Sequence, residues 1–125
     1  MKFSCPSRTS TDLKVIERLP GLKGRYVHSL NMTFAHYEFA AGSKIHEHFR
    51  PEEEVYEVIE GELELTIDDK TEIARPGIVA IVPANIRHSV RALTDGRLIV
   101  VDHPARKLSS VLIPRTVAKC AVGDI

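Results

Sequence analysis

Hydrophobic and polar positions alternate along short stretches of this chain, and turn-forming residues separate those stretches. The clearest example covers residues 62–69, where Leu63, Leu65 and Ile67 fall on one face of a strand. Alternation with a period of two is the pattern of a half-buried β-strand, whereas an amphipathic helix repeats every 3.6 residues or so. The continuous apolar run of residues 78–82 predicts a strand that is buried on both faces.

Other stretches predict further short strands. They cover residues 26–40 as two strands, 55–59, 71–74, 88–93 and 97–102. Residues 13–19 are too few to distinguish a helical turn from an edge strand, and no stretch predicts a long helix. The apolar residues of the stretch before Ala40 are expected in the core, where inward ones would line a site: Met32, Phe34, Tyr37 and Phe39. Many short strands with regular turns predict an all-β sandwich or small barrel.

Composition narrows the choice of partners. The 125 residues are 43% hydrophobic and 27% charged, with a formal net charge of zero. A neutral chain has no broad basic face for phosphate groups, so nucleic acid is not expected as a partner. No apolar run has the length of a membrane span and the opening residues lack a signal-peptide core, so a cytoplasmic location is expected. Cys5 and Cys120 fit neither a metal motif nor a disulfide scaffold and are expected to be unpaired thiols.

Four residues have the chemistry and spacing of a metal site. His46 and His48 are two apart, so on a strand both imidazoles would share a face. Glu54 begins the next expected strand, and a Pro-Ala-Asn turn precedes His88. Three imidazoles and one carboxylate directed at one point would bind a metal ion.

These residues lie in two motifs that resemble those of the cupin family. Glu54, six residues and Gly61 match the end of the first motif, and Gly77, five residues, Pro83 and later His88 match the second. The gap between His48 and the glutamate is one residue longer than usual. The choice of Glu54 over Glu52 or Glu53 therefore depends on counting back from Gly61. Asn85 replaces a family glycine and tolerates the left-handed backbone better than other residues.

The resemblance implies a double-stranded β-helix, the jelly-roll barrel of cupins, and a homodimer. We expect one domain over residues 1–125, with a barrel core at about 25–106 and extensions at 1–24 and 107–125. Apolar segments at 110–113 and 117–122 are expected to pack against the barrel or a second subunit. Exposed strand edges in a barrel this small also favour a dimer.

The ligand types indicate which metal and which ligands the site would accept. Nitrogen-rich ligation favours Mn, Fe, Co, Ni, Cu or Zn over Ca or Mg, and leaves the choice among the six open. Four protein ligands on a six-coordinate ion leave two positions for water or substrate. The ion would act as a Lewis acid or as a redox centre for dioxygen, on an anionic or chelating small molecule.

A narrower resemblance concerns the end of the core, LIVVDHPARK. Pro104 and Arg106 match small cupins that include proteins which linearise unsaturated uronates from pectin breakdown. In those proteins an acid that precedes this segment acts in catalysis, and its aligned position here is Val100. Asp102 is the nearest carboxylate and would share the face of Val100. We therefore identify Asp102 as a candidate general acid or base and Arg106 as a candidate for holding a substrate carboxylate.

The sequence thus predicts a metal-binding cupin that acts as an enzyme on a small polar or sugar-acid-like molecule. A lyase or isomerase and a dioxygenase are both compatible with these residues. A non-catalytic module that binds a sugar or metabolite is the alternative from another class.

Overall fold

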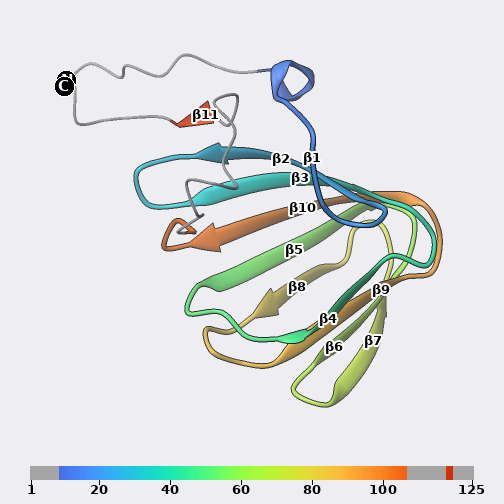
Figure 1. Cartoon of the computed structure of the whole chain (residues 1–125). Helices are drawn as coiled ribbons and strands as arrows, with labels where there is room; N and C mark the ends of the chain where they lie inside the picture. Colours follow the sequence, from blue (N-terminus) through green and yellow to red (C-terminus); the bar gives the residue numbers. More distant parts are fainter. Residues whose placement is uncertain (1–8, 107–117, 120–125) are drawn as a thin grey trace.

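A larger β-sheet forms one wall of the molecule in this computed structural model, which describes residues 9–106 and 118–119 (Figure 1). Its strand order is β1-β2-β3-β10-β5-β8, all in antiparallel pairs, and β11 pairs with β2 in parallel. The strands are β1 (Ile16–Leu19), β2 (Leu22–His28), β3 (Thr33–Phe39), β5 (Glu53–Glu60), β8 (Val79–Val82), β10 (Gly96–His103) and β11 (Ala118–Lys119).

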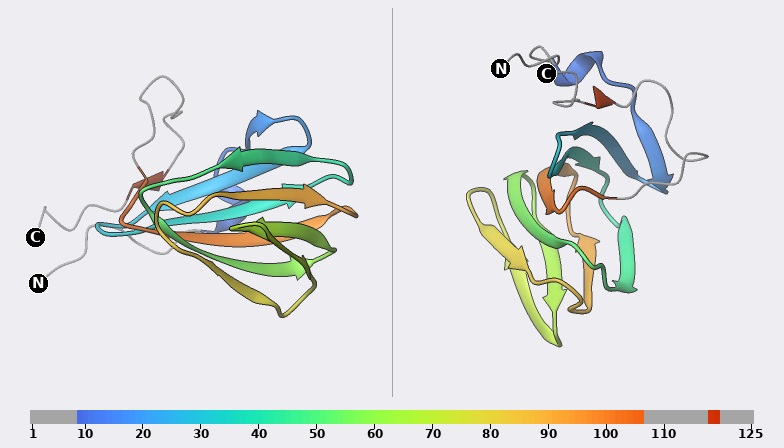
Figure 2. Two further views of the ribbon diagram at one scale, coloured as in Figure 1. Left: turned by 90° about the horizontal axis from the view of Figure 1, so that it is seen from below. Right: turned by 90° about the vertical axis from the view of Figure 1, so that its left-hand side faces the viewer.

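A smaller antiparallel sheet, in the order β4-β9-β6-β7, forms the opposite wall (Figure 2). Its strands are β4 (Lys44–His48), β6 (Leu63–Ile67), β7 (Lys70–Ala74) and β9 (His88–Ala92). The chain crosses between the two sheets several times, which makes the fold the predicted jelly roll. The part of the chain that the structure describes has one short 3-10 helix, η1 (Ser10–Asp12). None of its helices is long and apolar enough to span a membrane.

The core lies between the two sheets because each strand directs alternate side chains inward. In β6, Leu63 and Leu65 are buried as the alternation predicts. Val58 and Leu98 from the larger sheet meet them in the same apolar cluster. At the end of β5, Gly61 has a φ of 82° and a Cβ there would collide with the Asp95 carbonyl. This turn therefore requires glycine.

Strand β8 differs from the prediction for the apolar run 78–82. That run was expected to be buried on both faces, but Val79 is 56% exposed and Ile81 is 60% exposed. The prediction was wrong because β8 is an edge strand that pairs with β5 and has no described layer over its outer face. Only its inward residues, Ala80 and Val82, are partly or fully buried.

Of the four apolar residues in and before β3 that were expected in the core, two are buried and two are exposed. Tyr37 and Phe39 are buried, whereas Phe34 is 40% exposed on the outer face and Met32, just before the strand, is 44% exposed. The predictions for Cys5, for Cys120 and for most of the tail concern residues outside the described part of the chain. Within that tail, β11 pairs with Val27 and His28 of β2.

Candidate metal centre and cavity

Three of the four predicted metal ligands converge inside the barrel. His48 on β4, Glu54 at the start of β5 and His88 at the start of β9 each offer a ligand atom, and these atoms all lie within 4.8 Å of one another. The His48 and His88 rings have centroids 4.2 Å apart. His88 Nε2 and Glu54 Oε1 are 3.1 Å apart and both are buried, yet neither atom has a hydrogen-bond partner in suitable geometry. Such a set of orphaned donor atoms fits a metal ion.

Backbone carbonyls determine the tautomer of both neutral imidazoles. His48 Nδ1 lies 2.8 Å from the carbonyl oxygen of His46, and His88 Nδ1 lies 3.0 Å from that of Ile86. A carbonyl oxygen can only accept a hydrogen bond, so each Nδ1 carries the proton. In the neutral rings the Nε2 lone pairs are therefore available as ligands, as they are in many metal sites.

The fourth predicted ligand, His46, is exposed and lies outside this group. The reason is a β-bulge between β4 and β9. Ile45 pairs with Val90 and His48 pairs with His88, so two residues of β4 oppose one residue of β9. The bulge breaks the alternation that would direct residues two apart to the same face. The His46 and His48 ring centroids are 6.3 Å apart.

The glutamate in the group is the one obtained by counting back from Gly61. Glu54 is only 3% exposed and points inward, whereas Glu53 is exposed on the outer face of β5. Glu52 is buried but lies outside the group.

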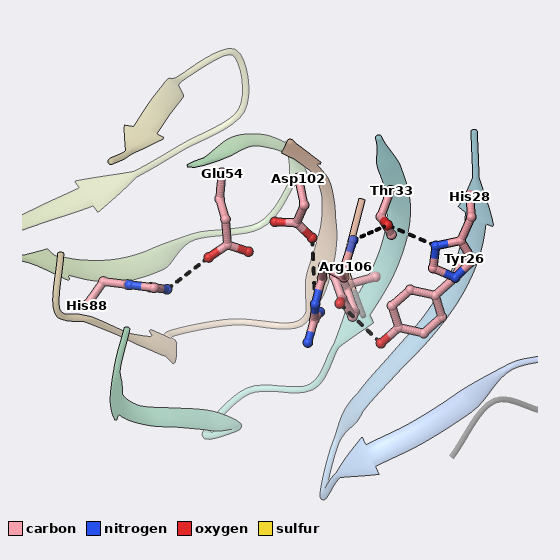
Figure 3. Close-up of polar contacts among 8 residues, drawn as sticks. Tyr26, His28, Thr33, Glu54, His88, Asp102 and Arg106 are labelled. Carbon is pink, nitrogen blue, oxygen red and sulfur yellow. Dashed lines mark hydrogen bonds and ion pairs between the residues drawn. The ribbon is translucent and has the colours of Figure 1, made fainter. Parts of the chain in front are cut away.

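Asp102 lies between Glu54 and Arg106 (Figure 3). It pairs in register with Glu54 across β10 and β5, is fully buried, and has its Oδ2 at 3.8 Å from Arg106 Nε. Burial and the neighbouring Glu54 carboxylate raise the pKa of Asp102 well above its usual range. Burial alone would raise the pKa of Glu54, but His88 and Asp102 beside it lower that pKa below its usual value. The pKa values of these two neighbouring carboxyl groups are therefore shifted in opposite directions.

A hydroxyl from β3 anchors the segment that carries Arg106. Thr33 is fully buried, and its Oγ1 accepts a hydrogen bond from the Arg106 backbone N–H at 2.8 Å. The same oxygen lies 2.8 Å from His28 Nδ1 (Figure 3). Arg106 is thereby held against the sheet, with its side chain only 8% exposed.

His48 and Glu54 line a cavity of about 80 Å³ inside the barrel. Three arginines and three tyrosines also line it: Arg18, Arg50, Arg106, Tyr26, Tyr37 and Tyr56. Of these residues, Arg106 was predicted at the site, and inward residues of β3 such as Tyr37 were expected to line it. Arg18 and Arg50 were not predicted, because arginines are common at exposed positions and these two come from distant segments.

Comparison with known proteins agrees with this architecture. The family model of the cupin domain matches residues 35–104, and no curated protein matches the sequence. An RmlC-like cupin from Shewanella frigidimarina has a similar structure, with a TM-score of 0.78 and 23% identity over 86% of this chain and 97% of that chain. KdgF from Halomonas sp. also has a similar structure, with a TM-score of 0.78 and 18% identity over 83% of this chain and 97% of that chain. For oxalate decarboxylase from Bacillus subtilis the TM-score is 0.73 and the identity is 20%, over 81% of this chain and 30% of that chain.

Proposed function

This chain belongs to the cupin family, and from that premise we propose that it is a metal-dependent enzyme acting on a small polar or carboxylated molecule. One observation carries the proposal: the candidate ligands His48 and Glu54 line a cavity that three arginines also line. Cationic side chains around a metal site favour an anionic substrate because the anion offsets their charge.

The residues of the site have distinct roles in this proposal. His48, Glu54 and His88 would hold a divalent Mn, Fe, Co, Ni, Cu or Zn ion. His46 would complete the predicted ligand set only if β4 turned its imidazole inward. A bound ion would supply Lewis-acid chemistry or, in a dioxygenase, redox chemistry. Arg106 binds a substrate carboxylate through its planar pair of N–H donors. Asp102, which lies beside both Glu54 and Arg106, takes and returns a proton.

Metal analysis of protein purified without a histidine tag is the first test. The metal-loaded protein is then incubated with unsaturated uronates, hydroxy acids and enediols, while NMR monitors conversion and an electrode monitors oxygen. Conversion of one class with metal-dependent turnover supports the enzyme, and oxygen uptake identifies a dioxygenase. Saturable binding without conversion under every one of the six metals would instead favour a binding module.

We also propose that two copies pair through the outer face of the larger sheet. The strand register aligns one apolar side chain from each of five strands in a single row. The row, here called the apolar row, runs Val27, Phe34, Val101, Val55 and Ile81. Exposed apolar patches of this kind are typical of interaction sites.

The size and charge of this face favour a second copy of the chain as the occupant. The apolar row crosses five strands about 4.8 Å apart, so it spans roughly 20 Å of the sheet, a width that the interface of two small domains can occupy. Both charge signs lie nearby, in the pairs Arg25–Glu38 and Arg97–Glu60. A face of mixed sign can complement itself across a two-fold axis, whereas a face of one sign cannot.

A further inference from the structure

Two half-buried arginines form no ion pair with any carboxylate in the described part of the chain. Within residues 9–106, every other arginine forms an ion pair: Arg25 with Glu38, Arg75 with Glu62, Arg87 with Glu47, Arg91 with Glu64, Arg97 with Glu60 and Arg106 with Asp102. The two exceptions, Arg18 and Arg50, both line the cavity. Exposed arginines need no partner, but a guanidinium turned inward loses water and gains stability from an anion.

Arg18 extends from β1 toward a pair of tyrosines. Its guanidinium carbon lies 5.8 Å from the centroid of the Tyr26 ring, which is a cation–π distance. Tyr26 in turn accepts a hydrogen bond from the Tyr37 hydroxyl at 3.1 Å, and the two rings meet edge to face. The Nε of Arg18 is buried with no hydrogen-bond partner. The tyrosines therefore hold the guanidinium in place while its donors stay available to a ligand.

Arg50 lines the same cavity from the segment between β4 and β5, two residues after His48. The Asn85 backbone N–H donates to the Arg50 carbonyl at 2.7 Å, which ties this segment to the turn before β9. Arg50 is thus placed beside the candidate metal ligands, whereas Arg18 lies over the tyrosine pair.

The charges around the cavity do not balance. Arg18, Arg50 and Arg106 line the cavity with one carboxylate, Glu54, and Asp102 lies beside Arg106, so these residues are net positive even when both acids are ionised. A divalent metal adds further positive charge. A ligand with one carboxylate offsets part of this charge, and a ligand with two offsets more.

We infer that the cavity takes a small dicarboxylate, including oxo- and hydroxy-dicarboxylates, with one acid group at Arg18 and Arg106 and the other at Arg50 beside the metal ligands. This rests on the proposed function and names its substrate class. The cavity is small, at about 80 Å³, and so favours a compact molecule over an oligosaccharide or a nucleotide. Arg18 is then a specificity-determining residue, because it recognises the acid group that a monocarboxylate lacks.

The test compares acids that share one carbon skeleton. Metal-loaded protein is titrated calorimetrically with succinate against butyrate and with 2-oxoglutarate against 2-oxopentanoate. The parent is expected to bind one dicarboxylate at least about tenfold more tightly than its monocarboxylate partner. Arg18→Gln should remove that preference and leave monocarboxylate affinity and metal content unchanged. Arg18→Lys keeps the charge but loses the planar fork, so it should give an intermediate result.

Arg25→Gln is the matched control, since Arg25 lies on the outer face of β2 and pairs with Glu38. It should keep the full preference. A parent protein that binds metal but shows no dicarboxylate preference, or no saturable binding of either dicarboxylate, would overturn the inference and leave the metal-dependent function standing. An equal loss for both acids in Arg18→Gln would also overturn it. A parent that binds none of the six metals refutes the proposed function itself.

Discussion

Next to the candidate metal site, the two faces of the larger sheet carry side chains of unexpected polarity. On β5, Glu54 points inward and is 3% exposed, whereas the next residue, Val55, points outward in the apolar row. Likewise on β10, Asp102 is fully buried and Val101 belongs to the outer row. Carboxylates in the interior and apolar side chains on the surface are both unfavourable by themselves. In our proposals, a metal ion and an anionic ligand would complete the inner face, and a second copy of the chain would cover the outer one.

The largest loss of metal affinity is expected when a candidate metal ligand is replaced. Glu54→Ala and His88→Ala should each lower metal affinity by more than about a hundredfold, since even residues behind the ligands contribute tenfold to a hundredfold. Mass spectrometry of bound metal after gel filtration measures this. Glu53→Ala is the matched control because Glu53 belongs to the same strand and faces outward. Metal loss in Glu53→Ala but not in Glu54→Ala would reverse the assignment of the carboxylate.

A second change tests whether the buried acid beside the metal ligands does chemistry. Asp102→Asn preserves the shape of the side chain, so metal content and ligand binding should remain. Turnover should fall about a hundredfold or more if Asp102 transfers a proton. Asp69→Asn, in the exposed turn between β6 and β7, controls for the loss of one carboxyl group. Unchanged turnover in Asp102→Asn would exclude this residue from the reaction.

The outer face is tested by a charge placed within the apolar row. Phe34→Glu puts a carboxylate into the proposed interface, and burying it there should weaken dimerisation about tenfold to a hundredfold. Light scattering across a concentration series measures the dissociation constant. Leu30→Glu is the control, because Leu30 is 64% exposed in the loop before β3. A parent protein with the 13.9 kDa monomer mass at micromolar concentration would refute the dimer.

The smallest effect is expected at His46, on the smaller sheet. The bulge leaves this imidazole exposed while His48 points into the barrel. Because His46 would reach the ion only after β4 rearranges, His46→Ala should weaken metal binding by about tenfold at most, less than the loss of His88. A loss as large as that of His88→Ala would mean that β4 closes on the metal and directs both imidazoles to it. No loss would reduce the protein ligand set to three.

Much of this architecture was predictable from local sequence. A period of two determines which side chains of a strand share a face, so the all-β class, most strands and the inward positions of β6 followed directly from the pattern. Turn chemistry was equally local. Gly61 is required by its backbone and neighbours, and Asn85 adopts the left-handed conformation expected of it, with a φ of 64°. The resemblance to the cupin motif, counted back from Gly61, selected Glu54, which the structure brings together with His48 and His88.

What only the tertiary structure decided depends on pairing between distant segments. The bulge that turns His46 outward arises in the register between β4 and β9, and the position of β8 at a sheet edge exposes Ile81. Neither property is encoded in the local alternation of residues. Arg18 and Arg50 are 32 residues apart and belong to unlike segments, so their shared cavity exists only once the barrel closes. Local sequence sets the direction of a side chain along its strand, whereas the fold sets which neighbours that side chain meets.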